Sequence, residues 1–132
     1  MIRSPRRGVS RTDVRDSTVY RRSELFFDAL RVIEEEYANE RLSLTVVARR
    51  IATSRRQLQR SFSEVGGTSF RRELQRIRMS RAADLLYEGR LSVQEVAAAV
   101  GYRQAAQFAK AFRRRHGAPP SAFRRTNGRL AA

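Results

Sequence analysis

Residues 42–62, LSLTVVARRIATSRRQLQRSF, decide the fold, and residues 91–112, LSVQEVAAAVGYRQAAQFAKAF, repeat their pattern. In each copy a serine that can cap a helix precedes apolar residues at spacings of three and four, which is typical of one buried helix face. A tight connection and a second short helical pattern follow. The chain therefore contains the same unit twice: a short helix, a turn and another short helix.

The apolar positions of the two copies correspond one by one. Two copies are too few for a solenoid, so we expect a pair of units that presents the same surface twice. The turn of the second unit contains one extra residue, so residues of the second helices correspond at an offset that is larger by one. The matching residues are Ser43, Leu44, Val47, Ala48, Ile51, Leu58 and Phe62 in the first unit, and Ser92, Val93, Val96, Ala97, Val100, Phe108 and Phe112 in the second.

Further helical patterns precede and join the units. Ser23 can cap a first helix that reaches about Asn39, and a longer helix after Ser69 spans ~27 Å before Gly89 ends it. A last short turn follows Pro119-Pro120. The sequence thus predicts an all-α fold of about seven helices, with two helix-turn-helix subdomains joined by a long connecting helix.

Composition shifts mark the ends of the chain. Residues 1–22 contain Pro5, Gly8 and few large apolar residues, which predicts a flexible basic arm. The predicted boundaries are 1–22 for the arm, 23–67 for the first subdomain, 68–90 for the connecting helix, 91–125 for the second subdomain, and 126–132 for a flexible tail.

Charge indicates the class of partner. The 132 residues include 28 Lys and Arg against 13 Asp and Glu, a net charge of +15, which favours a polyanion. Residues 96–100 are typical of the longest apolar stretches and fall far short of the ~20 residues of a membrane span. The absence of cysteine fits a reducing compartment. We expect double-stranded DNA as the partner, no membrane contact and a cytoplasmic location.

The outward faces of the second helices carry the candidate contacts. Arg56, Gln59, Arg60 and Ser63 form one stripe; Arg can pair with guanine and Gln with adenine. Any exposed helix of a basic protein shows such residues, but the preceding short helix and its cap favour recognition. The second stripe offers fewer hydrogen-bond formers and consists of Arg103, Ala106, Gln107, Lys110 and Arg114.

No group of residues suggests catalysis. His116 has no carboxylate or second histidine near it in the sequence, so core packing is the favoured interpretation. Glu34–Glu36 resemble a solvated face, and Gly66-Gly67 a helix stop. We predict no enzyme activity, no metal site and no cofactor.

Residues 23–125 resemble the DNA-binding domain of the AraC/XylS family of bacterial transcription regulators. In residues 91–124 a Gly-aromatic turn, an inward Phe pair, a Gly stop and a Pro followed by an aromatic and Arg recur in the family's order. The chain departs from the family pattern at four positions. Ala52 replaces the usual turn glycine, Arg103 and Gln104 replace serines, and His116 replaces an aromatic.

The resemblance implies a monomer that reads two successive major grooves of an asymmetric site, usually as an activator that contacts RNA polymerase. It also implies a stand-alone member of the family. The expected base-reading residues are Arg55, Arg56, Gln59 and Arg60 in the first unit, and Ala105, Ala106, Gln107 and Lys110 in the second. The expected DNA-backbone residues are Ser54, Ser63, Arg103, Arg113, Arg114 and Arg115.

Two other functions fit the sequence. A charge of +15 gives affinity for any duplex through counterion release, so a non-specific architectural (nucleoid) protein is one alternative. The other is an RNA polymerase-binding adaptor with weak DNA contact, for which Glu34–Glu36 would be the candidate surface.

Overall fold

The computed structural model describes residues 11–126 and 129–130, with side chains for residues 17–124. This part of the chain contains six α-helices, one 3₁₀ turn and two strands of two residues each, which confirms the predicted all-α class. The elements are α1 (Arg11–Glu36), α2 (Leu44–Arg50), α3 (Arg55–Glu64), α4 (Phe70–Glu88), α5 (Val93–Ala99), α6 (Ala105–His116), η1 (Pro120–Ala122), β1 (Arg125–Thr126) and β2 (Arg129–Leu130).

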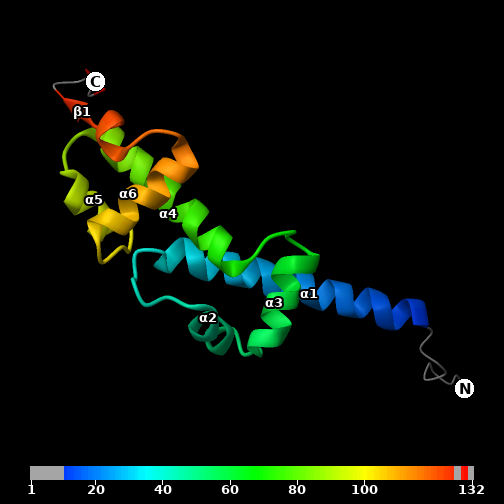
Figure 1. The fold of residues 1–132 in the computed structure, drawn as a ribbon. Coiled ribbons are helices and arrows are strands. Elements are labelled where there is room, and N and C mark those ends of the chain that lie inside the picture. Colours follow the sequence, from blue (N-terminus) through cyan, green and yellow to red (C-terminus); the bar gives the residue numbers. More distant parts are fainter. Residues whose placement is uncertain (1–10, 127–128, 131–132) are drawn as a thin grey trace, which may run out of the picture.

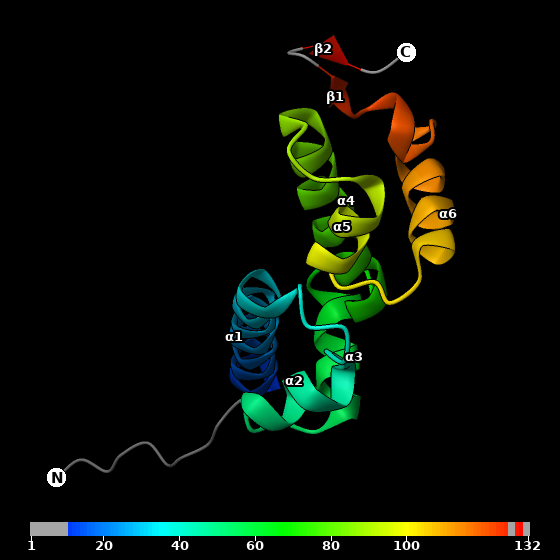
Figure 2. The ribbon, with the colours of Figure 1, turned by 90° about the vertical axis from the view of Figure 1, so that its left-hand side faces the viewer.

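The helices form two lobes that share α4 (Figures 1 and 2). The first lobe contains α1, α2, α3 and the N-terminal half of α4, and the second contains the rest of α4 with α5, α6 and η1. Along α4, Ile77 is buried in the first core and Met79 in the second. Tyr37 packs against both cores, so the two lobes meet at the end of α1.

The predicted repeat is present in three dimensions. The Thr53 amide donates to the Ala48 carbonyl at 2.9 Å, and the Tyr102 amide donates to the Ala97 carbonyl at 2.9 Å. The residue before each donor has a left-handed backbone, with φ of 58° at Ala52 and 94° at Gly101. The family departure at Ala52 therefore leaves the turn itself unchanged.

The prediction that the first helix begins at Ser23 is wrong, because α1 begins at Arg11. Pro5 and Gly8 lie upstream, and nothing between Arg11 and Ser23 breaks a helix, so a packed helix can extend at one hydrogen bond per added residue. Arg22 of this extension forms an ion pair with Glu64 of α3. The predicted flexible arm is thus wrong for residues 11–22, and residues 1–10 lie outside the described part.

The predicted flexible tail also needs correction. Arg125 pairs with Leu130 and Thr126 with Arg129 in an antiparallel ladder. The two residues between the strands are Asn-Gly, a strong sequence signal for a two-residue hairpin connection. The prediction of a flexible tail did not take this signal into account. The remaining tail positions, 127–128 and 131–132, lie outside the described residues.

Arginines hold the two lobes together. Arg78 of α4 donates from Nε to the Tyr37 carbonyl at 2.8 Å and from Nη2 to the Asn39 carbonyl at 2.8 Å. Its guanidinium lies 5.7 Å from the ring centre of Tyr102, and burial lowers its pKa from the ordinary value. Arg103 bonds the Glu40 carboxylate at 2.8 Å. These contacts join the second unit to the first.

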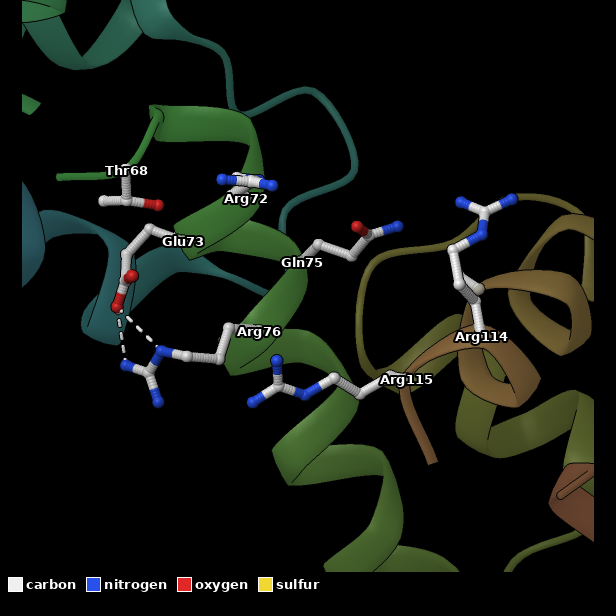
Figure 3. A pocket seen from close by; sticks show the side chains of 8 residues that line it. Thr68, Arg72, Glu73, Gln75, Arg76, Arg114 and Arg115 are labelled. Atoms are coloured by element: carbon white, nitrogen blue, oxygen red, sulfur yellow. Dashed lines mark hydrogen bonds and ion pairs between the residues drawn. The ribbon is translucent and has the colours of Figure 1, made fainter. Parts of the chain in front are cut away.

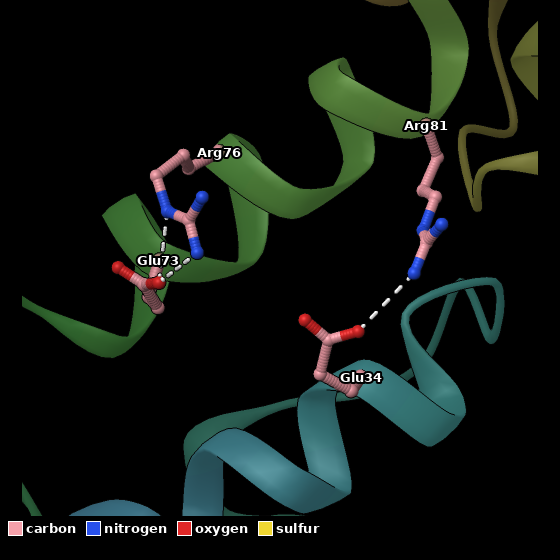
Figure 4. Close-up of polar contacts among 4 residues, drawn as sticks. All are labelled: Glu34, Glu73, Arg76 and Arg81. Carbon is pink, nitrogen blue, oxygen red and sulfur yellow. Dashed lines mark hydrogen bonds and ion pairs between the residues drawn. The ribbon is translucent and has the colours of Figure 1, made fainter. Parts of the chain in front are cut away.

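The acidic run is not simply a solvated face, as the sequence had indicated. Glu34 forms an ion pair with Arg81 of α4 at 3.3 Å (Figure 4), and Glu36 forms one with Arg50 of α2. Only the exposed Glu35 has no such contact among the described residues. Two of the three carboxylates thus tie α1 to its neighbours.

His116 is half-buried and packs against aromatic residues at the edge of the second core, which agrees with the predicted packing role. Its ring centre lies 4.4 Å from that of Phe112 and 5.4 Å from that of Phe123. Its Nε2 forms a hydrogen bond with the Met79 carbonyl at 3.1 Å. His116 therefore joins the end of α6 to the middle of α4 and to the segment after η1.

Candidate nucleic-acid interface

Helix α3 is held with one face inward and one face in solvent. The Ser54 hydroxyl accepts from the Gln57 amide at 3.1 Å and starts the helix, as the sequence predicts. Leu58 and Phe62 are buried, and the Ser61 hydroxyl donates to the Gln57 carbonyl at 3.0 Å. The inward side is therefore anchored, and the opposite side stays available for a ligand.

The exposed face of α3 carries the predicted first stripe. Arg55, Arg56, Gln59 and Ser63 are exposed, and none of their side chains has a hydrogen-bond partner among residues 17–124. Arg60 has one distant contact, 3.9 Å from its Nε to the Glu64 carboxylate. The donors and acceptors of this face are free to contact another molecule.

Helix α6 starts differently. Gln104 makes no side-chain cap, and the first residue of the helix, Ala105, is half-buried. Ala106, Gln107 and Lys110 are exposed and lie on one side of the helix, opposite the buried Phe108, Ala111 and Phe112. Three of the four predicted second-unit readers thus share an open surface, whereas Ala105 lies at its edge.

The predicted backbone-contacting residues occupy two kinds of position. Arg113, Arg114 and Arg115 are exposed at the last turn of α6. In contrast, the hydroxyl of Ser54 is used as the helix cap, and Arg103 is bonded to Glu40. The α6 arginines are therefore the ones that are free to meet an anion.

A groove between α4 and α6 was not predicted from the sequence. One cavity of about 400 Å³ lies between Arg72, Gln75 and Arg76 of α4 and Arg114 and Arg115 of α6 (Figure 3). A neighbouring cavity of about 370 Å³ includes the predicted reader residues Gln107 and Lys110. The spacing of polar residues along α4 could have indicated this groove. From the sequence, α4 is predicted only as a connecting helix.

The described residues contain neither a metal-binding cluster nor a helix able to cross a membrane. No group of three histidine or acidic side chains is close enough to hold a metal within the described part. No described helix combines the length and apolarity that a membrane crossing requires. The polar surface of α3, α4 and α6 is instead dominated by arginine, lysine and glutamine.

Comparisons with known proteins agree with this geometry. A family model described as a helix-turn-helix domain matches residues 47–126. The HTH-type transcriptional regulator GlxA of Rhizobium meliloti is 40% identical over 101 residues, covering 75% of this chain and 31% of that protein. The raffinose operon transcriptional regulatory protein RafR of Pediococcus pentosaceus is 31% identical over 106 residues, covering 80% and 38%. The chain spans about a third of the length of these relatives.

Solved structures show the same arrangement of helices. The C-terminal domain of AraT, a response regulator from Geobacillus stearothermophilus, superposes with a TM-score of 0.74 and 32% identity, covering 76% of this chain and 83% of that domain. The DNA-binding domain of AdpA, a global transcriptional factor solved in complex with a target DNA, superposes with a TM-score of 0.66 and 29% identity, covering 73% and 89%.

Proposed function

The chain belongs to the AraC family of helix-turn-helix transcription regulators, and we propose that it binds an asymmetric double-stranded DNA site as a monomer. In this proposal α3 and α6 enter successive major grooves on one side of the duplex. The base-reading residues are Arg55, Arg56, Gln59 and Arg60 in α3, and Ala105, Ala106, Gln107 and Lys110 in α6. The proposed backbone contacts come from Ser63 and the α6 arginines; Ser54 and Arg103, which the sequence also predicts to contact the backbone, already bond within the chain.

One observation carries the proposal: two reading faces with unoccupied polar side chains belong to lobes that side-chain contacts join. Arg78 and Arg103 bridge the lobes, which favours a defined orientation of α3 relative to α6. The 19 residues of α4 extend about 28 Å, whereas successive grooves on one face lie about 34 Å apart. A connecting helix shorter than this spacing favours a duplex that bends toward the protein.

The regulatory output that we propose is activation through contact with RNA polymerase, in the cytoplasm and at the nucleoid. Its support is the family membership of the chain. In vitro transcription from a promoter that carries the selected site tests it, since an activator raises transcript yield whereas a repressor lowers it.

The competing adaptor function has less support. It would use the carboxylates of Glu34–Glu36 as a docking surface, yet Glu34 and Glu36 form ion pairs with Arg81 and Arg50. A non-specific architectural protein remains the second candidate, since a net charge of +15 favours any duplex. The free Arg and Gln side chains of α3 favour specific binding over this function.

Selection of bound duplexes from a random pool tests the proposed function. We expect a two-part motif whose halves lie about one helical turn apart. The same selection with Arg56→Ala should lose information only in one half, because the second unit is unchanged. Absence of enrichment in the wild-type selection would favour the architectural protein.

Sedimentation of the complex with a minimal selected site tests the stoichiometry. We expect one chain per duplex because both reading units already lie on one chain. Two chains per minimal site would contradict the monomer.

A further inference from the structure

Three cavities that share wall residues lie between the two reading faces. At the α3 end, a cavity of about 360 Å³ reaches Thr68 and Arg71 before and on α4, and its wall combines the polar Gln59 and Ser63 with the apolar Leu44, Phe62 and Phe70. Thr68 also lines the cavity beside Arg115, and Arg71 also lines the cavity beside Lys110. The walls of the three cavities therefore include residues of α3, α4 and α6.

The wall of the 400 Å³ cavity contains more arginines than carboxylates. Glu73 is the one acidic residue in the wall of the 400 Å³ cavity, and it accepts two hydrogen bonds from Arg76, at 2.9 and 2.6 Å (Figure 4). This bond raises the pKa of Arg76. Arg72 and Arg115 have no ion-pair partner among residues 17–124.

The orientation of these side chains concentrates the charge in one place. Figure 3 shows Arg115 extending from α6 toward Arg76 of α4, and Gln75 extending from α4 toward α6. Several arginines gathered on one exposed surface raise the local positive potential, which favours an anionic ligand. The groove is therefore completed by a ligand that brings negative charge.

The geometry of a bound duplex identifies that ligand. If α3 and α6 occupy successive major grooves, the intervening minor groove and its two flanking phosphate strands face the α4 surface between them. We propose that the α4–α6 groove binds phosphodiesters of the DNA backbone between the two half-sites, through Arg72, Arg114 and Arg115, with Gln75 beside them. This inference rests on the proposed function.

The duplex backbone fits the groove better than a free polyphosphate does. The cavities are open to solvent and share wall residues, and their walls come from α3, α4 and α6. A site for a small anion needs a closed set of donors, whereas a backbone needs a path along the surface. The spacer phosphates should therefore contribute affinity, with little dependence on the spacer bases.

Neutral phosphate analogues on the selected duplex test the inference without changing the protein. Methylphosphonates are placed singly at each spacer phosphate, and dissociation constants are measured for wild-type protein. We expect one or two positions to weaken binding about tenfold, as for loss of a charge-assisted hydrogen bond. Equal affinity at every spacer position would overturn the inference and leave the proposed function intact.

The protein side of the test uses the double variant Arg72→Gln/Arg115→Gln. It should bind the unmodified site at least tenfold more weakly and become insensitive to the same methylphosphonates, because the contacts are already lost. Its salt slope, d log K/d log [salt], should fall in magnitude by about 0.9 for each lost contact. A thermal melt by circular dichroism confirms that the variant is folded.

Arg90→Gln is the matched control, since Arg90 is exposed beyond the far end of α4 and has no ion pair among residues 17–124. It removes one positive charge outside the groove and should keep the methylphosphonate sensitivity. Binding of inorganic triphosphate that depends on Arg72 and Arg115, together with neutral spacer phosphates, would assign the groove to a free anion and overturn the inference. Failure to select any site would instead remove the proposed function as well.

Discussion

The two helix-turn-helix units share one backbone turn but differ in what surrounds it. In the first unit the turn residue is Ala52, which is exposed and adopts a φ of 58°. In the second unit it is the buried Gly101, with a φ of 94°. A Cβ added to Gly101 would lie 2.7 Å from the Tyr37 carbonyl and 2.9 Å from Arg78 Nε. Packing between the lobes, more than the turn itself, requires glycine there.

The reading faces differ as well. Helix α3 presents Arg56, Gln59 and Arg60, whereas the equivalent face of α6 presents mostly Ala106, Gln107 and Lys110. Side chains with directional donors discriminate bases, while alanine offers at most an apolar contact to a thymine methyl. We infer that the first unit supplies most of the base discrimination, and that the second unit mainly clamps the duplex.

The largest expected effect tests the turns. Gly101→Ala should destabilise the protein by about 2–4 kcal/mol, because it combines a strained φ with overlap against Tyr37 and Arg78. Ala52→Gly should change stability by less than about 1 kcal/mol, because relief of the left-handed strain is offset by a freer unfolded chain. Urea unfolding of both variants measures the difference. Equal destabilisation would show that the two turns have the same environment.

The sequence predicted the elements that local signals define. Serine caps were placed correctly at Ser43, Ser54 and Ser92, where each hydroxyl accepts an amide three residues ahead. The long helix and its glycine stop at Gly89 were also predicted correctly. These features depend on neighbouring residues, so the sequence carries them directly.

The features that were missed depend on partners far away in the chain. Nothing near Arg22 in the sequence reveals its ion pair with Glu64, and nothing near Arg78 reveals its bonds to the end of α1. The groove also forms only when α4 and α6 pack together, which places Arg72 and Arg115 in the wall of one cavity. The exposed faces of α3 and α6 could be predicted because they follow from helix periodicity.

The second-largest expected effect is on DNA binding and distinguishes the two reading faces. Arg56→Ala should cost about 1–3 kcal/mol on the best site and relax the preference at one or two positions. Lys110→Ala should weaken good and poor sites more evenly, since a single ammonium contributes less directional recognition. Binding to libraries randomised separately in each half-site measures both. Equal information in the second half, lost on Gln107→Ala, would reverse the assignment of roles.

The smallest effect concerns the start of the first helix in each unit. Helix α5 has a capping box: the Ser92 hydroxyl accepts from the Glu95 amide at 3.1 Å, and Glu95 accepts from the Ser92 amide at 2.8 Å. Helix α2 has only the serine half of this arrangement, since Val46 occupies the position of Glu95. The two units should therefore respond differently to acid.

The bonds from Ser92 lower the pKa of Glu95 below its ordinary value of 4.5. A carboxylate whose pKa is lowered in the folded state adds stability above its unfolded pKa, and loses it as the pH falls through the folded value. Glu95→Gln keeps a hydrogen-bonding side chain without the charge, so it should be slightly less stable than wild type at pH 6 and equal to it at the lowest pH. Urea midpoints between pH 6 and pH 2 measure this difference.

A matched pair of variants moves the same effect into the first unit. Val46→Glu and Val46→Gln lose similar packing, so their difference in stability isolates the charge of a new capping box with Ser43. We expect Val46→Glu to be the more stable of the two near neutral pH, and the gap to close in acid. If the difference in stability between the Glu and Gln forms does not change with pH in either unit, the carboxylate there acts through packing. The caps of α2 and α5 would then not differ in the way their sequences indicate.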